Sequence, residues 1–283
     1  MLLDKPSGIT SARAVARVKR LLSKGTKVGH TGTLDPLASG LLVLLLGRTT
    51  RLSRYVAGLD KEYVTTARFG AVSDTLDADG RITPLEHAPI PDEATIRAAT
   101  EHFSGEIRQV PPMASAVKMN GERLYKALHR GEEIERESRP ATIHAFELLS
   151  LDGDTATFYV SCGGGTYVRT LVVDLADSLG TGAYLTALRR TRVGHLKVEV
   201  ASPPEDFTPE SLETHIIQSV VVVGHLPVVS VSPSVGERLV CNGRPLDAFG
   251  IGGSYQVQSG GELLAIYRDV GESARAEVVL CGP

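Results

Sequence analysis

Residues 29–46 read Gly-His-Thr-Gly-Thr-Leu-Asp-Pro-Leu-Ala-Ser-Gly-Leu-Leu-Val-Leu-Leu-Leu, a glycine-flanked loop followed at once by an apolar run. The apolar run lies between Gly40 and Gly47, which favours a buried β-strand. In the loop, Asp35 can approach a substrate closely and act as a nucleophile or a base. The other interpretation is a tight turn in which this aspartate caps a backbone group, a common role of Asp.

The rest of the chain predicts short helices and strands without a regular βαβ alternation. Apolar residues at helical spacing predict helices over about 10–23, 94–103, 124–129, 167–179 and 184–190, while alternating or apolar runs predict strands over 41–46, 63–69, 143–151 and 155–162. The fold class is therefore predicted as α+β, with a mixed, mainly antiparallel sheet flanked by helices. Composition shifts after Pro203-Pro204, so we predict a larger domain over 1–227 and a small all-β domain over 228–283.

Charge is distributed unevenly along the 283 residues. The totals, 30 Lys and Arg against 33 Asp and Glu, give a net charge of −3 and exclude a uniformly basic protein. Residues 1–54, however, hold ten basic residues and two acidic ones, whereas residues 198–283 hold four basic and eleven acidic ones. This asymmetry favours an N-terminal face that binds a polyanion, with a solvated helix face as the alternative.

Cysteine and histidine spacing gives no sign of a metal site or a disulfide framework. The three cysteines, at positions 162, 241 and 281, are far apart and odd in number, so we expect reduced thiols in a cytoplasmic protein. The loop 75–80 imitates a calcium loop, but Thr75 stands where the first ligand should be Asp. The longest apolar run, 41–46, is too short to span a bilayer, so we expect no membrane association.

Two further clusters could take part in binding or chemistry. Residues 162–171 (Cys-Gly-Gly-Gly-Thr-Tyr-Val-Arg-Thr-Leu) place three glycines before a predicted helix start, where free backbone N–H groups can meet an anion. Arg169 can pair there with a carboxylate or a phosphate, and Tyr167 offers a ring face. Tyr63 is a candidate platform on which a base could stack. The alternatives are a strand-to-helix turn and an ordinary core aromatic.

Taken together, these motifs resemble the TruB family, the bacterial tRNA pseudouridine-55 synthases. Residues 29–40 resemble the family's catalytic signature, and further matching motifs follow in the family's order at 4–11, 61–63, 109–112, 115–118, 121–125, 139–140, 165–171 and 188–190. The likeness covers about residues 2–200. The C-terminal stretch resembles the family's small RNA-binding PUA-type domain more loosely. Two departures are Ala114, where the family often has Tyr, and Gly163-Gly164, which replaces a more usual Ser-Lys.

The resemblance implies a pseudouridine synthase fold and the conversion of uridine 55 in the tRNA T-loop to pseudouridine, without cofactor or metal. Asp35 would start cleavage of the glycosidic bond, Arg169 would pair with it, and Tyr63 would stack on the target base. The substrate-binding residues implied by the likeness are Lys5, His30, Tyr63, Tyr167 and Leu188, with His30 filling the gap left by the flipped nucleotide.

Two other functions stay open at this stage. One is a tRNA-binding or tRNA-folding module that has lost catalysis. A positioned carboxylate argues against it, because a module that only binds RNA has no need of one. The other is a related synthase that modifies another RNA, for example under the direction of a guide RNA. We expect a monomer that binds the T-stem-loop of tRNA through the basic segment 1–54.

Overall fold

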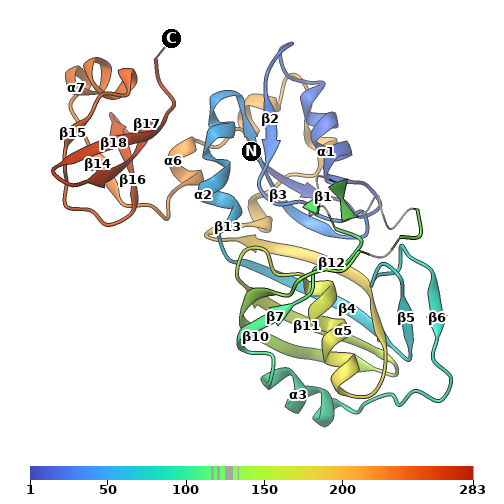
Figure 1. Ribbon diagram of the computed structural model, residues 1–283. Helices are drawn as coiled ribbons and strands as arrows, with labels where there is room; N and C mark the ends of the chain where they lie inside the picture. The colour runs from blue at the N-terminus through green and yellow to red at the C-terminus, as the bar shows by residue number, and fades with distance from the viewer. Residues whose placement is uncertain (116–117, 120–121, 125–129, 133, 283) are drawn as a thin grey trace.

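The computed structural model describes residues 1–115, 118–119, 122–124, 130–132 and 134–282. Its main body is built on a nine-stranded sheet (Figure 1), in which the central path runs β1-β3-β12-β4-β11-β10-β7. Strand β2 pairs with β3, and β13 pairs with β12. The strands are β1 (Leu2–Lys5), β2 (Val28–His30), β3 (Ser39–Leu46), β4 (Lys61–Phe69), β7 (Gly105–Gln109), β10 (Arg139–Asp152), β11 (Thr155–Cys162), β12 (Ala183–Val193) and β13 (Leu196–Lys197).

Neighbouring strands of this sheet are antiparallel except where β3 meets β12 in parallel. Small hairpin pairs lie outside it: β5 (Ala71–Ser73) with β6 (Ile82–Pro84), and β8 (Lys118–Met119) with β9 (Glu122–Arg123). The helices are α1 (Ser11–Lys19), α2 (Ser53–Ala57), α3 (Glu93–Glu101), α5 (Val168–Ser178), α6 (Ser219–Val222) and α7 (Pro233–Arg238). Short 3-10 turns are η1 (Gly47–Leu52), η2 (Val198–Val200), η3 (Pro204–Asp206), η4 (Leu212–His215) and η5 (Val240–Asn242).

The main core forms because one face of the sheet is apolar. Along β11, alternate residues from Ala156 to Cys162 are buried, whereas their neighbours are half-exposed, which is the period of a strand covered on one side. Helix α5 packs Leu171, Val172 and Leu175 into the same core. The helix begins at the glycine-rich turn and carries Arg169 in its first turn, so core packing fixes where that guanidinium points.

A second sheet of five strands occupies the C-terminal part. Its order is β14 (Val228–Ser230), β16 (Ser254–Ser259), β17 (Glu262–Val270), β18 (Ser273–Val279) and β15 (Leu246–Asp247). Figure 1 shows this sheet beside α2 and α6, away from α5. One apolar cluster joins the two parts, because Leu263, Ile266 and Val278 pack together with Leu52 and Val56.

Several predictions from the sequence are confirmed. The fold is α+β with mainly antiparallel sheets, the predicted strand pair around residues 152–154 is β10 and β11, and helices occur at 93–101 and 168–178. The boundary between domains at 227/228 stays a prediction. The short helix predicted over 124–129 falls almost wholly outside the described residues.

Other local predictions are wrong. Residues 184–190, predicted as a helix, belong to β12 at the centre of the sheet, where β12 pairs with both β3 and β4. Tertiary pairing overrides local spacing there. Strand β2 lies inside the predicted loop 25–40, and the first helix ends at Lys19.

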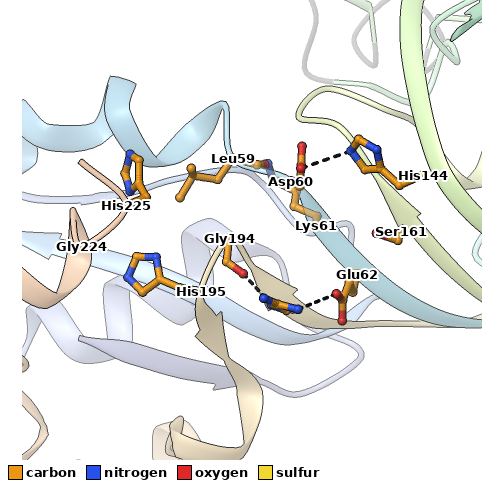
Figure 2. Close-up of a pocket in the computed structure, with 11 residues that line it drawn as sticks. Leu59, Asp60, Lys61, Glu62, His144, Ser161, Gly194, His195, Gly224 and His225 are labelled. Carbon is orange, nitrogen blue, oxygen red and sulfur yellow. Dashed lines mark hydrogen bonds and ion pairs between the residues drawn. The ribbon is translucent and has the colours of Figure 1, made fainter. Parts of the chain in front are cut away.

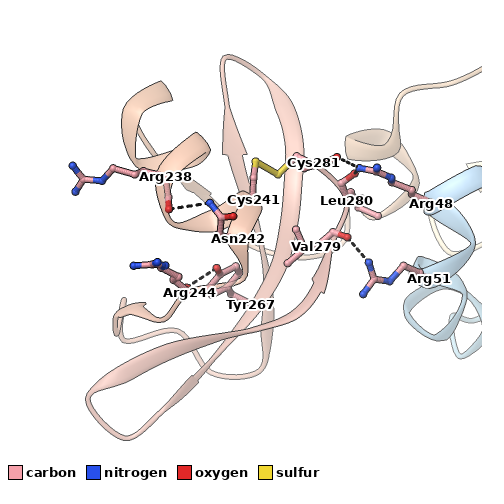
Figure 3. Close-up of a disulfide and its surroundings, with 11 residues drawn as sticks. Arg48, Arg51, Arg238, Cys241, Asn242, Arg244, Tyr267, Val279, Leu280 and Cys281 are labelled. Atoms are coloured by element: carbon pink, nitrogen blue, oxygen red, sulfur yellow. Dashed lines mark hydrogen bonds between the residues drawn. A yellow bond between two sulfur atoms is a disulfide. The ribbon is translucent and has the colours of Figure 1, made fainter.

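The prediction of three reduced cysteines is also wrong, because Cys241 and Cys281 form a disulfide (Figure 3). Cysteine 162 is a buried free thiol. The turn η5 and the chain end after β18 meet in space, with 5.1 Å between the two Cα atoms. A separation of 40 residues in the sequence could not reveal that proximity. Across the described residues, no helix is long and apolar enough to cross a membrane.

Candidate active site

Asp35 sits in the loop between β2 and β3, and the N-terminal segment holds that loop. The Ser11 hydroxyl donates to the Leu34 carbonyl at 2.9 Å and accepts from the Leu34 amide at 2.8 Å. The amide of Ala38 donates back to the Asp35 carbonyl at 3.1 Å. The N-terminal motif and the Asp35 loop, separate in the sequence, therefore form one structural unit.

Lys5 belongs to the same unit, but its ammonium group is buried. It donates to the carbonyls of Pro6 at 2.9 Å, Ile9 at 2.6 Å and Pro36 at 3.5 Å. Burial lowers the pKa of Lys5 to about 8, while the charge of Asp35 works in the opposite direction. The contacts make Lys5 a brace for the loop, and its predicted role in substrate binding stays a prediction.

Arg169 holds two carboxylates on one buried guanidinium. Its Nη2 lies 2.8 Å from Oδ2 of Asp35, and its Nη1 lies 3.0 Å from Oδ2 of Asp77. It also donates to the carbonyls of Thr75 and Ala114, both at 2.7 Å. The side chains of Arg169 and Asp77 are 5% and 4% exposed, whereas that of Asp35 is 35% exposed. Asp35 is thus the carboxylate that a substrate can reach.

Asp77 is the member of this site that the sequence did not reveal. It lies in the loop that imitates a calcium site, where its Oδ1 accepts from the Thr75 hydroxyl at 2.6 Å and from the Asp79 amide at 3.2 Å. A Cβ on Gly80 would come within 2.5 Å of three side chains of this turn, so only glycine fits. Within the described residues, no group of three or more His, Cys, Asp and Glu side chains could hold a metal ion. No spacing rule links Asp77 with Arg169, 92 residues further on.

The predicted aromatic residues lie within electrostatic reach of Asp35. Tyr63, on the central strand β4, is 6% exposed, and burial raises its pKa, with a smaller contribution from Asp35. Tyr167 is half-buried at the start of α5, and its backbone amide and carbonyl bond the Gln109 side chain at 3.0 and 3.2 Å. Burial raises the pKa of Tyr167, and Asp35 adds to that shift.

Leu188 is buried on β12, the strand next to Tyr63. His30 lies on β2, and its pKa is lowered by burial and by the charge of Arg190. Its Nδ1 is buried without a hydrogen-bond partner. The structure pairs Asp35 with Arg169 and places the two tyrosines within the electrostatic influence of Asp35, whereas no hydrogen bond or ion pair joins His30 to Asp35 among the described residues.

Burial is the main influence on the pKa of the Asp35 carboxyl. It raises the pKa of Asp35 above the ordinary 3.8, and the charge of Asp77 raises it further. Arg169 and Lys5 oppose this shift. Asp35 is therefore less solvated than a surface aspartate, and its ion pair with Arg169 favours the charged form, an arrangement that suits a nucleophile or a base.

The basic segment 1–54 is divided by the structure into two groups. Arg48 and Arg51 donate to backbone carbonyls of the C-terminal tail (Figure 3), and Arg54 pairs with Glu277 at 3.5 Å. These three exposed cations contact the C-terminal sheet, and the prediction that the whole segment faces a polyanion stays a prediction. A second group, also exposed, has no ion pair to any described carboxylate: Arg13, Lys19, Arg20, Lys24 and Lys27.

A pocket of about 430 Å³ lies apart from Asp35, where the first residues of β4 meet the turn after β12 and the linker at Gly224 (Figure 2). Two ion pairs lie in its wall: His144 lies 3.2 Å from Asp60, and Arg192 lies 2.8 Å from Glu62. The Lys61 ammonium in the same wall donates to the carbonyls of Ala57 and Leu59. The pocket includes none of the candidate catalytic residues, so it is separate from the candidate site around Asp35.

Comparison with known proteins places these residues in a family context. The N-terminal domain model of TruB family pseudouridylate synthases matches residues 19–168, and the C-terminal domain model of tRNA pseudouridylate synthase B matches residues 169–218. A tRNA pseudouridine synthase B from Aromatoleum aromaticum is 42% identical over 94% of this chain and 87% of its own length. A second tRNA pseudouridine synthase B, from Chromohalobacter salexigens, is 40% identical over 100% of this chain and 91% of its own length.

Solved structures agree on the fold. The archaeal box H/ACA sRNP Nop10-Cbf5 complex contains a chain that superposes with a TM-score of 0.73 at 26% identity, over 98% of this chain and 85% of that one. An H/ACA RNP bound to a substrate RNA containing 2′-deoxyuridine gives a TM-score of 0.72 at 23% identity, over 99% and 85% of the two chains.

Proposed function

Because the chain belongs to the TruB family of pseudouridylate synthases, we propose that it converts uridine 55 in the T-loop of tRNA to pseudouridine. The observation that carries this proposal is the Asp35–Arg169 pair. A partly exposed carboxylate lies 2.8 Å from a buried guanidinium, on a loop braced by the N-terminal motif. A module that only binds RNA has no need of a carboxylate held towards its polyanionic ligand, since that charge would repel phosphates.

The chemistry is an isomerisation in which every atom of the uridine is kept. The C1′–N1 bond breaks, the uracil rotates, and a C1′–C5 bond forms as the proton on C5 leaves and N1 gains one. Nothing is oxidised or reduced, so a carboxylate and proton transfers suffice. Asp35 would start the reaction by attacking C6, by attacking C1′ or by removing a ribose proton.

The target nucleotide must leave its stack to reach Asp35. Extrusion of a nucleotide costs a few kcal/mol, and stacking on an aromatic ring returns about 1–3 kcal/mol per base. Tyr63 is the ring for that role, because it is buried beside Leu188 on the central strands. Tyr167, whose backbone is held by the Gln109 side chain, would contact the extruded nucleotide from the other side of the candidate site around Asp35.

Sequence likeness favours tRNA over another RNA as the substrate. Relatives named for tRNA are 40–42% identical over nearly the whole chain, while the Cbf5 chain of the archaeal complex is 26% identical. The exposed cations on α1 and in the following loop would follow the phosphates of the T-stem. Recognition through these cations and one flipped base requires no guide RNA.

The decisive experiment uses a uridine-containing T-stem-loop transcript and the purified protein. Chemical mapping of pseudouridine should give one modified site, at position 55. A transcript with cytidine at position 55 is the matched control and should stay unmodified. Modification at another position would contradict the assignment of uridine 55 as the target. Absence of any pseudouridine on full-length tRNA would contradict the proposed isomerase activity.

A further inference from the structure

Arg190 is the largest fully buried side chain among the described residues, at 2% exposure. It lies on β12, opposite Tyr63 of β4 on one side and Gly40 of β3 on the other. A guanidinium buried in a sheet is costly unless hydrogen bonds satisfy it. The hydrogen-bond partners of Arg190 therefore indicate its role.

Those partners stand at the two ends of the segment that carries Asp35. The Nε atom donates to the Leu41 carbonyl at 2.7 Å, and Nη2 donates to the Gly32 carbonyl at 3.1 Å. Arg190 also stands directly opposite Tyr63 where β12 pairs with β4. One residue thus links the entry and the exit of the Asp35 loop to the strand position that carries the ring expected to stack on the base.

The backbone of Arg190 is held as tightly as its side chain. A Cβ on Gly40 would lie 2.2 Å from the Arg190 carbonyl oxygen and 2.8 Å from its nitrogen, so β3 and β12 pair at a distance that only glycine allows. At the other end, Gly32 has a φ of +100°, which favours glycine. The Asp35 loop is therefore held against β12 at both of its ends, at Gly32 and at Gly40.

No described carboxylate forms an ion pair with Arg190. Burial is the main cause that lowers the pKa of Lys5 and of Lys61, and the nearby charge of Arg190 lowers both pKa values further. Arg190 is therefore held by the two carbonyls that it binds and not by an ion pair. Lysine could not replace it, since an ammonium is a point charge and lacks the planar fork that reaches both carbonyls at once.

We propose that Arg190 is a positioning residue that fixes the Asp35 loop relative to Tyr63, so that carboxylate and ring meet opposite sides of the extruded nucleotide. The role rests on the proposed function, but the placement of the loop can be measured without activity. Arg190 acts through Gly32, Leu41 and Tyr63 and does not itself touch the reacting atoms.

The test compares Arg190→Lys and Arg190→Gln with Arg68→Lys. Arg68 is the control on the neighbouring strand β4, because its guanidinium also forms a charged hydrogen bond, at 2.8 Å, but to Asp154 at the edge of the molecule away from the Asp35 loop. We expect both Arg190 variants to lower the single-turnover rate by about 100-fold, as for a misplacement of about 1 Å, with Kd for the T-stem-loop within threefold of wild type. Arg68→Lys should change neither quantity by more than threefold.

Hydrogen–deuterium exchange supplies the readout that a general loss of stability would not reproduce. In Arg190→Lys, the amides of Leu34 and Ala38 should exchange at least tenfold faster, while amides of the β10–β11 pair stay within twofold. Uniformly faster exchange, a rate within threefold of wild type, or failure of both variants to fold would each overturn the proposal. If the wild type has no isomerase activity, the proposed function fails while the exchange result still decides whether Arg190 fixes the loop.

Discussion

Oδ2 of Asp77 lies 3.0 Å from Nη1 of Arg169, and both side chains are almost wholly buried. This pair holds the guanidinium from behind, so that its other nitrogen faces Asp35. The carboxylate proposed to react, Asp35, and the carboxylate proposed to orient, Asp77, are therefore separated by one planar group. Their side chains are 35% and 4% exposed, and this difference supports the two proposed roles.

Asp77→Asn should lower the single-turnover rate by about tenfold or more, because a charge-assisted hydrogen bond contributes about 1.5–3 kcal/mol. Affinity for tRNA should stay within threefold, since Asp77 is buried behind Arg169. Asp79→Asn is the control in the same turn, because Asp79 contacts Asp77 through its backbone amide. Equal losses in both variants would show that the turn, and not the Asp77 carboxylate, matters.

Asp35→Asn should abolish isomerisation and leave tRNA binding largely intact. A group in general acid–base catalysis is worth about 10²- to 10⁴-fold, and removing a negative charge near phosphates does not weaken binding. Pseudouridine mapping and a filter-binding assay measure the two quantities. Asp60→Asn, an exposed aspartate paired with His144, should retain activity. Turnover of Asp35→Asn within tenfold of wild type would contradict the assignment.

The pH profile should carry the signature of Asp35. Because the pKa of this carboxyl is raised by burial, protonation begins at a higher pH than for a surface aspartate, and activity is lost as pH falls through that raised value. Asp77 contributes to the rise, so Asp77→Asn should move the acid limb to lower pH. Single-turnover rates across the acid range measure it. If the acid limb of Asp77→Asn lies at the same pH as that of the wild type, the charge of Asp77 does not set the pKa of Asp35 and this prediction is wrong.

The sequence predicted much of this site because its motifs carry the chemistry locally. Asp35 stands on a glycine-flanked loop, and Arg169 opens a helix with a regular apolar stripe. Asp77 could not be found that way, because its partner is remote in the sequence and a turn aspartate is common. The same holds for β12, whose residues have helical spacing but pair across the sheet, and for Cys241 and Cys281, which only the folded C-terminal sheet brings together.

The salt dependence of tRNA binding should distinguish the two groups of basic residues. Lys19→Ala and Arg20→Ala should each lower the slope of log K against log salt by up to about one unit, since each would remove a phosphate contact. Arg51→Ala is the control from the same basic segment. Its guanidinium donates to the Val279 carbonyl at 2.7 Å, so the slope should hardly change. A slope unaffected by Lys19 and Arg20 would place the RNA elsewhere.

Reduction of the Cys241–Cys281 disulfide should weaken substrate affinity more than catalysis. A bond that closes a loop of 40 residues stabilises by about 4 kcal/mol in the chain-entropy description. Its loss should therefore lower the melting temperature of the C-terminal sheet. The residues proposed to be catalytic all lie before residue 193, whereas Arg48 and Arg51 donate hydrogen bonds to carbonyls at 279–282 beside the disulfide. Loosening that end should raise KM for tRNA more than it lowers kcat, the pattern of lost uniform binding.

This test avoids deleting residues 228–283, which would expose the apolar cluster that Leu263, Ile266 and Val278 share with Leu52 and Val56. Melting curves and kinetics should be measured with and without a dithiol reductant. The Cys241→Ser/Cys281→Ser double variant is the control, because it should resemble the reduced wild type and lose any response to reductant. A fall in kcat with KM unchanged would contradict this prediction, because it would mean that the C-terminal sheet supports the Asp35 site and not only the affinity for tRNA.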